Sequence, residues 1–451
     1  MKKLIVLYYY LKSKYFNNVF SRKSLIKQQD KKVKRFIKNI CKKSKYYHNL
    51  YNGLDINDWT NFPITSKQEY LENFNTINTV NITKENAFNI AYKAEQDRNF
   101  SPKLNKITVG LSSGTSGNRG IFLVSDYERY FWAGNILGRI LPKSLFSRNK
   151  IAFFLRANSN LYESVKTKNI QFEYFDLLNP IEVNLNRLNE YMPTIIVAPP
   201  SMLKILAKEY NNKTLKIKPQ KLISVAEVLD DIDKNYIEKS FNLNIQQIYQ
   251  ATEGFIATTC KYGHFHINED LIAVQKEYID KEHKKFIPII TDFHRTSQPI
   301  IRYRLNDILT ELDEPCPCGS KYMAIKKIEG RCDDIFYLPN LEKNSLVPIF
   351  PDFLSRIIIF TSDEINDYKI IQKSIDKILI YIDIDNNIVK DCIKKKMYSL
   401  FNQQKCIKPD IEFIASYKHE NGKKFKRVES YLKITNLNSD NVSGLVESQL
   451  I

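Results

Sequence analysis

The feature that most constrains the fold of this chain is a regular alternation of apolar strands with helices in its middle. The predicted strands and helices, in chain order, are residues 194–198, 201–210, 221–225, 231–241 and 245–249. Apolar strands that alternate with helices form a parallel sheet covered on both faces, and ligands bind at the carboxyl ends of its strands. Glu227 and residues 250–254 follow two of these ends, so we expect a ligand site there.

The rest of the chain predicts one further domain. Residues 287–309 are β-rich, and beyond residue 334 short strands and a helix predict a small α+β unit. The predicted fold class is α/β, with a large N-terminal body of β-sheets flanked by helices and a small mobile C-terminal α+β domain. The predicted divisions are a basic helical arm at residues 1–50, the body at 51–330, a hinge at 331–334 and the small domain at 335–451.

The positive charge of the chain is concentrated in the arm. The chain has a formal net charge of +18, yet residues 1–45 contain fifteen Lys and Arg against the single acid Asp30, which leaves +4 for the remainder. A nucleic-acid-binding domain carries its excess charge over a binding surface of the fold. We therefore expect no nucleic-acid partner.

The first residues imitate a signal peptide without completing one. Residues 4–11 are apolar and follow Lys2 and Lys3, but the run is short and is followed by lysines instead of a small-residue cleavage site. It predicts a basic amphipathic helix that packs on the body, with peripheral contact to an anionic membrane or polymer as the alternative. Seven unevenly placed cysteines favour a reducing, cytoplasmic location.

Hydroxyls and glycines are densest at residues 111–120, which read LSSGTSGNRG. Such a loop can turn several backbone N–H groups and hydroxyls toward one point, which suits a polyphosphate. It is not the common P-loop, because no Gly-Lys-Ser/Thr follows. On the loop alone, a phosphate cradle and an ordinary surface loop both remain open.

Cysteine and histidine gather in two nearby segments. Cys260 precedes His264 and His266, and Cys316 is one residue from Cys318. Three thiolates and one imidazole would complete a tetrahedral structural zinc site, whereas independent buried thiols are the alternative. Strand alternation would let only one of the two histidines ligate, and the choice stays open.

Aromatic residues after the loop are candidates for a pocket wall. Phe131 and Tyr162, with the polar Asn158, lie where a helix and the following strand are predicted. Aromatic residues at helical spacing are more often part of the core.

Four motifs in this order resemble those of the adenylate-forming superfamily, in particular its phenylacetate–CoA ligase and coenzyme F390 synthetase-like branch. They are the Ser/Thr/Gly phosphate loop at residues 112–120, aromatic-x-x-Thr-Glu at 249–253, Tyr-Arg-x-x-Asp at 303–307 and Gly-Arg-x-Asp-Asp at 330–334. The Cys-x-Cys-Gly at 316–319 and His-Ile-x-Glu-Asp at 266–270 indicate this branch, in which such residues can hold zinc. The resemblance covers about residues 55–430.

The resemblance implies a role for each motif residue in binding ATP and Mg²⁺. The residues that would cradle the β- and γ-phosphates are Ser113, Gly114, Thr115, Ser116 and Gly117. Tyr249 would stack on adenine, Thr252 would meet the α-phosphate and Glu253 would hold Mg²⁺. Asp307 and Arg331 would contact the ribose, and Glu227 joins the predicted nucleotide-binding set.

The superfamily also uses a mobile C-terminal lysine in a Gly-Lys-x-x-Arg-Val motif. Lys424 matches by its distance to Arg427, and Lys423 matches by its distance to Gly422, because one residue is inserted here. The phosphate loop departs too, since Arg119 stands where a lysine is usual and a guanidinium has a different geometry.

The implied reaction is adenylation of a carboxylic acid to acyl-AMP with release of pyrophosphate. Transfer of the acyl group to a thiol, most often coenzyme A, would follow. Alternative acceptors are a carrier, a protein thiol or a sugar amine in polysaccharide or capsule biosynthesis. A rival of another class is a non-catalytic, zinc-stapled basic binding protein. The acid, the acceptor and the oligomeric state, including a homodimer, stay open.

Overall fold

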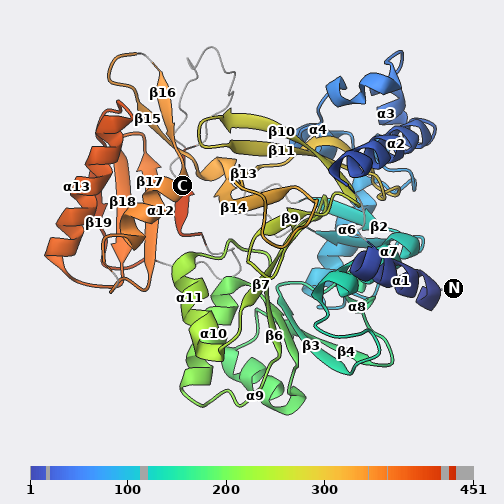
Figure 1. Ribbon diagram of the computed structural model, residues 1–451, viewed down its shortest axis with the longest axis horizontal. Helices are drawn as coiled ribbons and strands as arrows, with labels where there is room; N and C mark the ends of the chain where they lie inside the picture. Colours follow the sequence, from blue (N-terminus) through green and yellow to red (C-terminus); the bar gives the residue numbers. More distant parts are fainter. Residues whose placement is uncertain are drawn as a thin grey trace.

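The computed structural model describes residues 2–16, 21–111, 120–343, 345–362, 364–417 and 426–432. Figure 1 shows a large body, a basic arm at one side of it and a small C-terminal unit at the opposite side. The fold class predicted from the sequence is confirmed.

The predicted alternation of strands and helices forms the parallel half of the main sheet. Its strands pair in the order β4-β3-β5-β6-β7, all parallel. These elements are β3 (Asn149–Leu155), β4 (Ile170–Asp176), α9 (Ile181–Tyr191), β5 (Ile195–Ala198), α10 (Pro200–Asn211), β6 (Lys221–Ser224), α11 (Asp231–Phe241) and β7 (Ile245–Ala251). The expected bounds of this region are therefore correct to within two residues.

Alternate side chains of these strands enter two different cores. Ile151 and Phe153 of β3 pack in the core that contains α7 (Asp126–Ile140), whereas Ala152 and Phe154 pack with the helices α9, α10 and α11. A strand that is apolar on both faces can be buried on both. The helices on the two sides hold the sheet in place.

The same sheet continues with antiparallel strands beyond β7 and has twelve strands among the described residues. They are β8 (Gly254–Thr259), β9 (Phe265–Ile267), β10 (Ile272–Asp280), β11 (Lys285–Asp292), β12 (Ile300–Arg304), β13 (Asp307–Glu311) and β14 (Ala324–Arg331). Ala251 pairs with Gly254, so Thr252 and Glu253 form the two-residue turn at which the strand direction reverses.

The arm packs against the body, as expected. Its helices are α1 (Lys2–Leu11), the π-helix η1 (Lys12–Phe16), α2 (Arg22–Cys41) and α3 (Lys45–Leu50). A Cβ added at Gly134 of α7 would lie 2.7 Å from both the Tyr9 Cβ and the Val6 carbonyl oxygen, so glycine is required for this close approach of α1. Within the described ranges, no helix is both long and apolar enough to cross a membrane.

The remaining elements of the body are short. They are η2 (Ile56–Asn61), α4 (Lys67–Glu72), α5 (Phe74–Ile77), α6 (Lys84–Gln96), β1 (Thr108–Leu111), β2 (Ile121–Val124) and α8 (Asn160–Glu163). Ser66 caps α4 in a capping box with Glu69, which satisfies backbone N–H groups at the start of the helix.

The C-terminal unit has its own hydrophobic core, separate from those of the body. Its elements are η3 (Cys332–Asp334), β15 (Phe336–Pro339), β16 (Leu346–Ile349), α12 (Pro351–Ile359), β17 (Tyr368–Ser374), β18 (Lys377–Ile382), α13 (Asn387–Gln403), β19 (Asp410–Phe413) and β20 (Val428–Ser430). β14 runs from the body directly into η3, so a single connection leads into the unit.

Candidate active site

The predicted nucleotide-binding residues meet in one cleft of about 1980 Å³. The described members of the set that line the cleft are Glu227, Tyr249, Thr252, Glu253, Asp307 and Arg331. They come from the ends of β6, β7, β13 and β14, which the sheet brings to the same side. Residues of the C-terminal unit, including Arg356 and Arg427, also line the cleft.

Asp307 is positioned by backbone pairing and by a phenol. β13 pairs with β14 so that Asp307 lies opposite Arg331, which unites two motifs that are separate in the sequence. The Tyr249 hydroxyl donates a hydrogen bond of 2.6 Å to the Asp307 carboxylate. Burial, together with this carboxylate, raises the pKa of Tyr249 well above its ordinary value, so the phenol stays protonated and remains a donor.

Glu253 lies in the turn between β7 and β8. The Thr252 hydroxyl donates a hydrogen bond of 2.8 Å to its carboxylate. Burial raises the pKa of Tyr303, and the charge and hydrogen bond of Glu253 raise it further. The carboxylate therefore sits beside two neutral hydroxyls, and Arg295 holds the turn by donating to the Thr252 carbonyl.

Glu227 follows a strained position at the end of β6. Ala226 has a φ of +70°, which is unfavourable for a residue with a Cβ. The Ser201 N–H of α10 donates a hydrogen bond of 3.2 Å to the Glu227 carboxylate. Such strain persists where the surrounding structure determines it, commonly at ligand sites.

Two predicted groups lie outside the described residues. They are the phosphate-cradling residues Ser113, Gly114, Thr115, Ser116 and Gly117, and the two candidate lysines Lys423 and Lys424. The flanks of both segments are described. Leu111 of β1 and Gly120 border the first segment, Lys426 and Arg427 follow the second, and all four residues line the cleft.

Aromatic side chains form one wall of the cleft. Phe131 and Tyr162 line it as expected, whereas Asn158 binds Glu163 at 2.9 Å and is not among the lining residues. The Trp132 indole lies 5.8 Å from the Tyr162 ring and donates a hydrogen bond of 3.0 Å to Gln250. An apolar wall with a few polar groups suits an organic acid.

Asp292 and His294 also line the cleft, and the sequence analysis missed both. The backbone N–H of His294 donates a hydrogen bond of 3.0 Å to the Asp292 carboxylate. The imidazole of His294 stacks on the Phe131 ring, with 4.3 Å between the ring centroids. Burial raises the pKa of Asp292 to about 6, and burial lowers the pKa of His294 to about 3. The position of Asp292 at the end of a predicted strand was the only signal that could have identified it.

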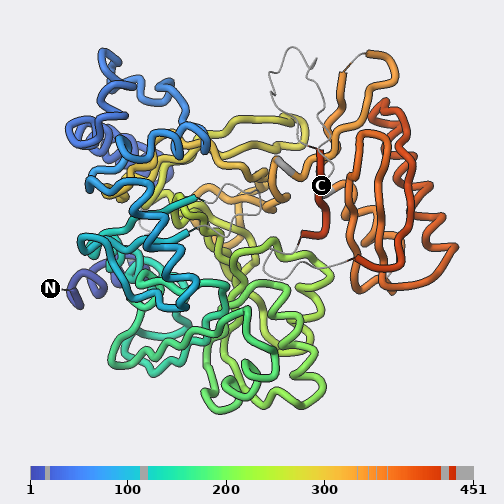
Figure 2. The backbone as a smooth tube through the Cα atoms, turned by 180° about the vertical axis from the view of Figure 1, so that it is seen from behind, coloured from blue at the N-terminus to red at the C-terminus, as the bar shows by residue number. Residues whose placement is uncertain are grey.

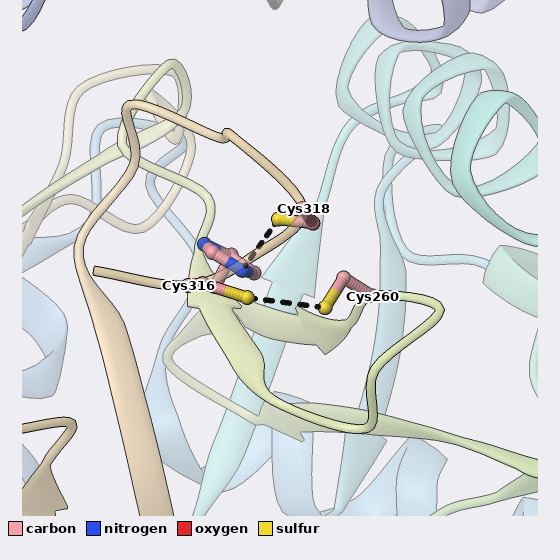
Figure 3. Close-up of side chains that lie close together, drawn as sticks. Cys260, Cys316 and Cys318 are labelled. Carbon is pink, nitrogen blue, oxygen red and sulfur yellow. Dashed lines mark hydrogen bonds between the residues drawn. The ribbon is translucent and has the colours of Figure 1, made fainter. Parts of the chain in front are cut away.

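The predicted cysteine and histidine cluster is assembled beside the sheet (Figure 3). The ligand atoms of Cys260, His266, Cys316 and Cys318 all lie within 4.8 Å of one another. The Cys260 and Cys316 sulfurs are 3.6 Å apart, and the Cys318 sulfur is 3.3 Å from His266 Nε2. Three sulfurs and one nitrogen at this spacing fit the tetrahedral donor set that Zn²⁺ prefers.

The geometry favours His266 over His264 as the fourth donor. His266 Nδ1 is 3.3 Å from the Tyr322 carbonyl oxygen, which leaves Nε2 facing the cysteines. A backbone carbonyl that binds the other ring nitrogen commonly fixes the orientation of a metal-binding histidine. His264 precedes β9 and its Nδ1 lies 3.3 Å from the Cys316 sulfur, so strand alternation does not carry it away as expected.

Charged residues join the C-terminal unit to the body. Arg427 is nearly buried and binds Asp233 of α11 at 2.6 Å and Asp367 of its own unit at 2.7 Å. The Tyr368 hydroxyl donates a hydrogen bond of 2.9 Å to Asp230, and Lys204 of α10 donates to the Asn366 carbonyl at 3.0 Å. We call these seven residues the interdomain latch.

Comparisons with known proteins agree with this architecture. No family model matches the chain. The protein CapK of Staphylococcus aureus is 24% identical over 390 residues, which cover 83% of this chain and 81% of CapK. Among solved structures, 2-hydroxyisobutyryl-CoA ligase in the postadenylation state with R3-HIB-AMP superposes with a TM-score of 0.64 at 13% identity, covering 90% of this chain and 89% of the ligase.

The chain has the fold of the adenylate-forming acyl-CoA ligases. The AtGH3.15 acyl acid amido synthetase, solved with 2,4-DB, shares this fold with a TM-score of 0.51 at 13% identity, covering 87% of this chain and 89% of the synthetase. The adenylate-forming fold thus occurs with two kinds of acyl acceptor among these structures.

The arrangement of the two domains can also be compared. The TM-score is 0.64 against the postadenylation state of 2-hydroxyisobutyryl-CoA ligase, 0.57 against its open state and 0.53 against its thioesterification state. All three states share the fold of this chain, and the present structure has its own arrangement of the C-terminal unit against the body. The interdomain latch is part of this arrangement.

The first prediction concerns the metal. Protein purified without added metal is expected to contain about one zinc per chain, because the four donors close a structural site. Replacing Cys316 or Cys318 with Ser should abolish this metal content and lower the unfolding temperature, as measured by elemental analysis and calorimetry. Cys392→Ser, which lies on α13 outside the cluster, is the matched control. A zinc content near zero in the unaltered protein would refute the assignment.

The second prediction concerns Asp292. Between about pH 4 and pH 6 the unfolded chain releases the Asp292 proton while the folded chain keeps it, so this group lowers stability as pH rises. Asp292→Asn should therefore raise the free energy of unfolding at about pH 7.5 by up to about 3 kcal/mol and leave it unchanged near pH 4.

Urea unfolding of the variant and the wild type at both pH values measures this difference, and the contribution of His294 cancels between them. The exposed Asp391→Asn serves as the control. Destabilisation of Asp292→Asn at both pH values would show that the fold needs the charged carboxylate.

Proposed function

We propose that this protein is an ATP-dependent ligase that activates a carboxylic acid as acyl-AMP and releases pyrophosphate. The observation that carries the proposal is the convergence of Tyr249, Glu253, Asp307 and Arg331 on one cleft, from four separate strand ends. The cleft belongs to a fold whose solved examples hold acyl-AMP compounds. A binding protein without turnover would not require these groups to meet.

In this proposal the cleft binds ATP between the sheet and the C-terminal unit. Asp307, oriented by Tyr249, accepts hydrogen bonds from the ribose hydroxyls, and the Tyr249 ring covers adenine. Residues 113–117 enclose the β- and γ-phosphates, because the ends of that segment, Leu111 and Gly120, line the same cleft. Thr252 reaches the α-phosphate from the turn after β7.

Glu253 is the proposed Mg²⁺ ligand. Its carboxylate is at the cleft, and oxygen donors of this kind are what Mg²⁺ prefers beside phosphates. The ion, when bound, would offset phosphate charge during attack by the carboxylate. The chain's own contribution is mainly positioning, because a carboxylic acid is already ionised near neutral pH and needs no general base.

The acyl group would lie along the aromatic wall formed by Phe131, Trp132 and Tyr162. This wall is large and apolar, which favours an aryl or aliphatic acid. His294 stays neutral there, because burial lowers its pKa to about 3. The imidazole therefore offers no positive charge to a substrate carboxylate. The carboxylate would instead be bound by groups that surround the ATP phosphates.

Either Lys423 or Lys424 would stabilise the charge on the carboxylate and the α-phosphate. Lys426 and Arg427, shortly after them in the chain, are held at the cleft, since Lys426 binds Asp334 at 2.8 Å and Arg427 belongs to the interdomain latch. We infer that the latch places this lysine for adenylation. Rotation of the unit about residues 331–334 would then remove it.

The second step is proposed as transfer of the acyl group to a thiol, with coenzyme A as the acceptor. A solved ligase of this fold contains both 2-HIB-AMP and CoA. An amine acceptor is the second candidate, supported by the acyl acid amido synthetase of the same fold. Acceptance of acyl-AMP by a thiol, a carrier or a sugar amine distinguishes the candidates.

The third prediction tests the reaction. The protein should release pyrophosphate from ATP with at least one acid in a panel of aromatic and aliphatic acids. Glu253→Ala should lower that rate by at least about a hundredfold, because the proposed Mg²⁺ ligand is lost, and should leave the unfolding temperature nearly unchanged. The exposed Glu190→Ala on α9 is the control. An unchanged rate in Glu253→Ala would exclude the metal assignment.

The fourth prediction tests the interdomain latch. Asp233→Asn and Arg427→Gln should each slow pyrophosphate release by at least about tenfold, because a buried ion pair is broken and the small unit leaves the adenylation arrangement. Transfer from acyl-AMP supplied ready-made should not slow. Small-angle scattering, which needs no substrate, should show an increased radius of gyration for both variants.

Arg187→Gln breaks an ion pair with Glu173 that is confined to the body and is the control for these measurements. Equal slowing of both half-reactions, with unchanged scattering, would show that the latch has only a structural role.

A further inference from the structure

The exposed face of α2 carries a continuous row of positive charge. Its members recur at intervals of three or four residues and are Lys23, Lys27, Lys31, Arg35, Lys38 and Lys42. Residues at this spacing lie on one face of a helix, and the row is about 28 Å long. We call it the α2 cation row.

The α2 cation row is not neutralised by its own helix. The only acid of α2, Asp30, binds Lys34 at 2.9 Å and accepts a hydrogen bond of 2.9 Å from the Trp59 indole. Within the described ranges no carboxylate forms an ion pair with any member of the row. The buried side of the helix is apolar, so the row faces solvent.

The row leads into a basic pocket of about 940 Å³ between α2 and α3. Lys38 and Lys42 belong to both the row and the pocket. The other basic residues that line the pocket are Lys43, Lys45 and His48, and its single acid is Asp55, whose carboxylate accepts a hydrogen bond from the Asn57 backbone N–H. Tyr51 also lines it, and its buried hydroxyl has no hydrogen-bond partner among the described residues. Lysines and a phenol donor suit a phosphate group.

A second exposed row, on α1 and η1, is apolar. Leu4, Tyr8, Leu11 and Tyr15 recur at intervals of four, three and four residues and are 69%, 59%, 38% and 57% exposed. The opposite side of α1 is packed tightly on α7 at Gly134. Apolar side chains aligned on the outer face of a rigidly held helix mark an interaction surface.

We propose that the arm docks this protein on an anionic phospholipid membrane. The outer row of α1 enters the interface between headgroups and acyl chains, while the α2 cation row and its pocket contact headgroup phosphates. A soluble polyanion would use the cations but would gain nothing from the apolar row. Because the arm carries exposed apolar side chains as well as exposed cations, it favours a lipid surface, independently of the proposed enzymatic function.

The position of the arm is compatible with such docking. Figures 1 and 2 place the arm and the C-terminal unit at opposite sides of the body in both views. A membrane bound at the arm would leave the small unit free to move. α7, which holds α1, also supplies Phe131 and Trp132 to the cleft, so the docked face is connected to the site by one helix.

The test is sedimentation of the full chain with vesicles of phosphatidylcholine alone or mixed with phosphatidylglycerol, at low and high salt. We expect binding only to the mixed vesicles and release at high salt, because screening weakens surface charge interactions. Lys27→Glu, Lys31→Glu, Arg35→Glu and Lys38→Glu together should weaken binding by about a hundredfold or more. Leu4→Ser with Tyr8→Ser should weaken it by about tenfold at low salt, where the wild type binds.

The matched control makes the same charge change on the body, with Glu at the exposed positions Lys208, Lys216, Lys218 and Lys239. It should bind nearly as the wild type does, and thermal unfolding checks that each variant is folded. If the control and the arm variant lost vesicle binding equally, net charge alone would explain the binding, and the proposal would be overturned. Failure of the wild type to bind mixed vesicles, or binding to soluble polyphosphate that vesicles do not displace, would also overturn it.

Discussion

The site depends on a single continuous sheet in which the strand direction reverses at β7. β7 is hydrogen-bonded in parallel to β6 on one side and antiparallel to β8 on the other. The reversal occurs at Thr252 and Glu253, and the antiparallel strands that follow bring Asp307 and Arg331 to the same cleft. Because every strand is fixed by its neighbours, these residues are placed by backbone hydrogen bonds before any ligand binds.

The distribution of charged groups differs between the cleft, the contact between the domains and the arm. In the cleft, hydroxyl groups donate to two of the carboxylates, as Tyr249 does to Asp307 and Thr252 to Glu253. Between the domains, Arg427 and Asp233 form a nearly buried ion pair. This pair stabilises the one domain orientation in which the two side chains meet. By contrast, the members of the α2 cation row are exposed, and the part of the chain that the structure describes places no carboxylate in an ion pair with them.

Much of the fold and part of the site were predictable because local patterns determined them. The apolar strands from residue 194 onward, the capped helix at Ser66 and the cysteine–histidine cluster are all readable from residue type and spacing. Asp292 and His294 were not, because their properties come from burial by distant elements such as α7. Asp233 was not predictable either, since on α11 it resembles any helical surface acid, and only the packing of the C-terminal unit buries it.

The sequence by itself determined the order and identity of the chemical groups: the acids at strand ends, the three thiols and the two histidines, and the basic arm. These groups can be identified from composition and from periodic patterns that extend over a few residues. Only the tertiary structure decided which groups meet. It selected His266 in preference to His264 by the carbonyl of Tyr322, and it joined Arg427 to Asp233 across the domains. Such choices depend on distances between segments that are far apart in the chain, and no local pattern contains them.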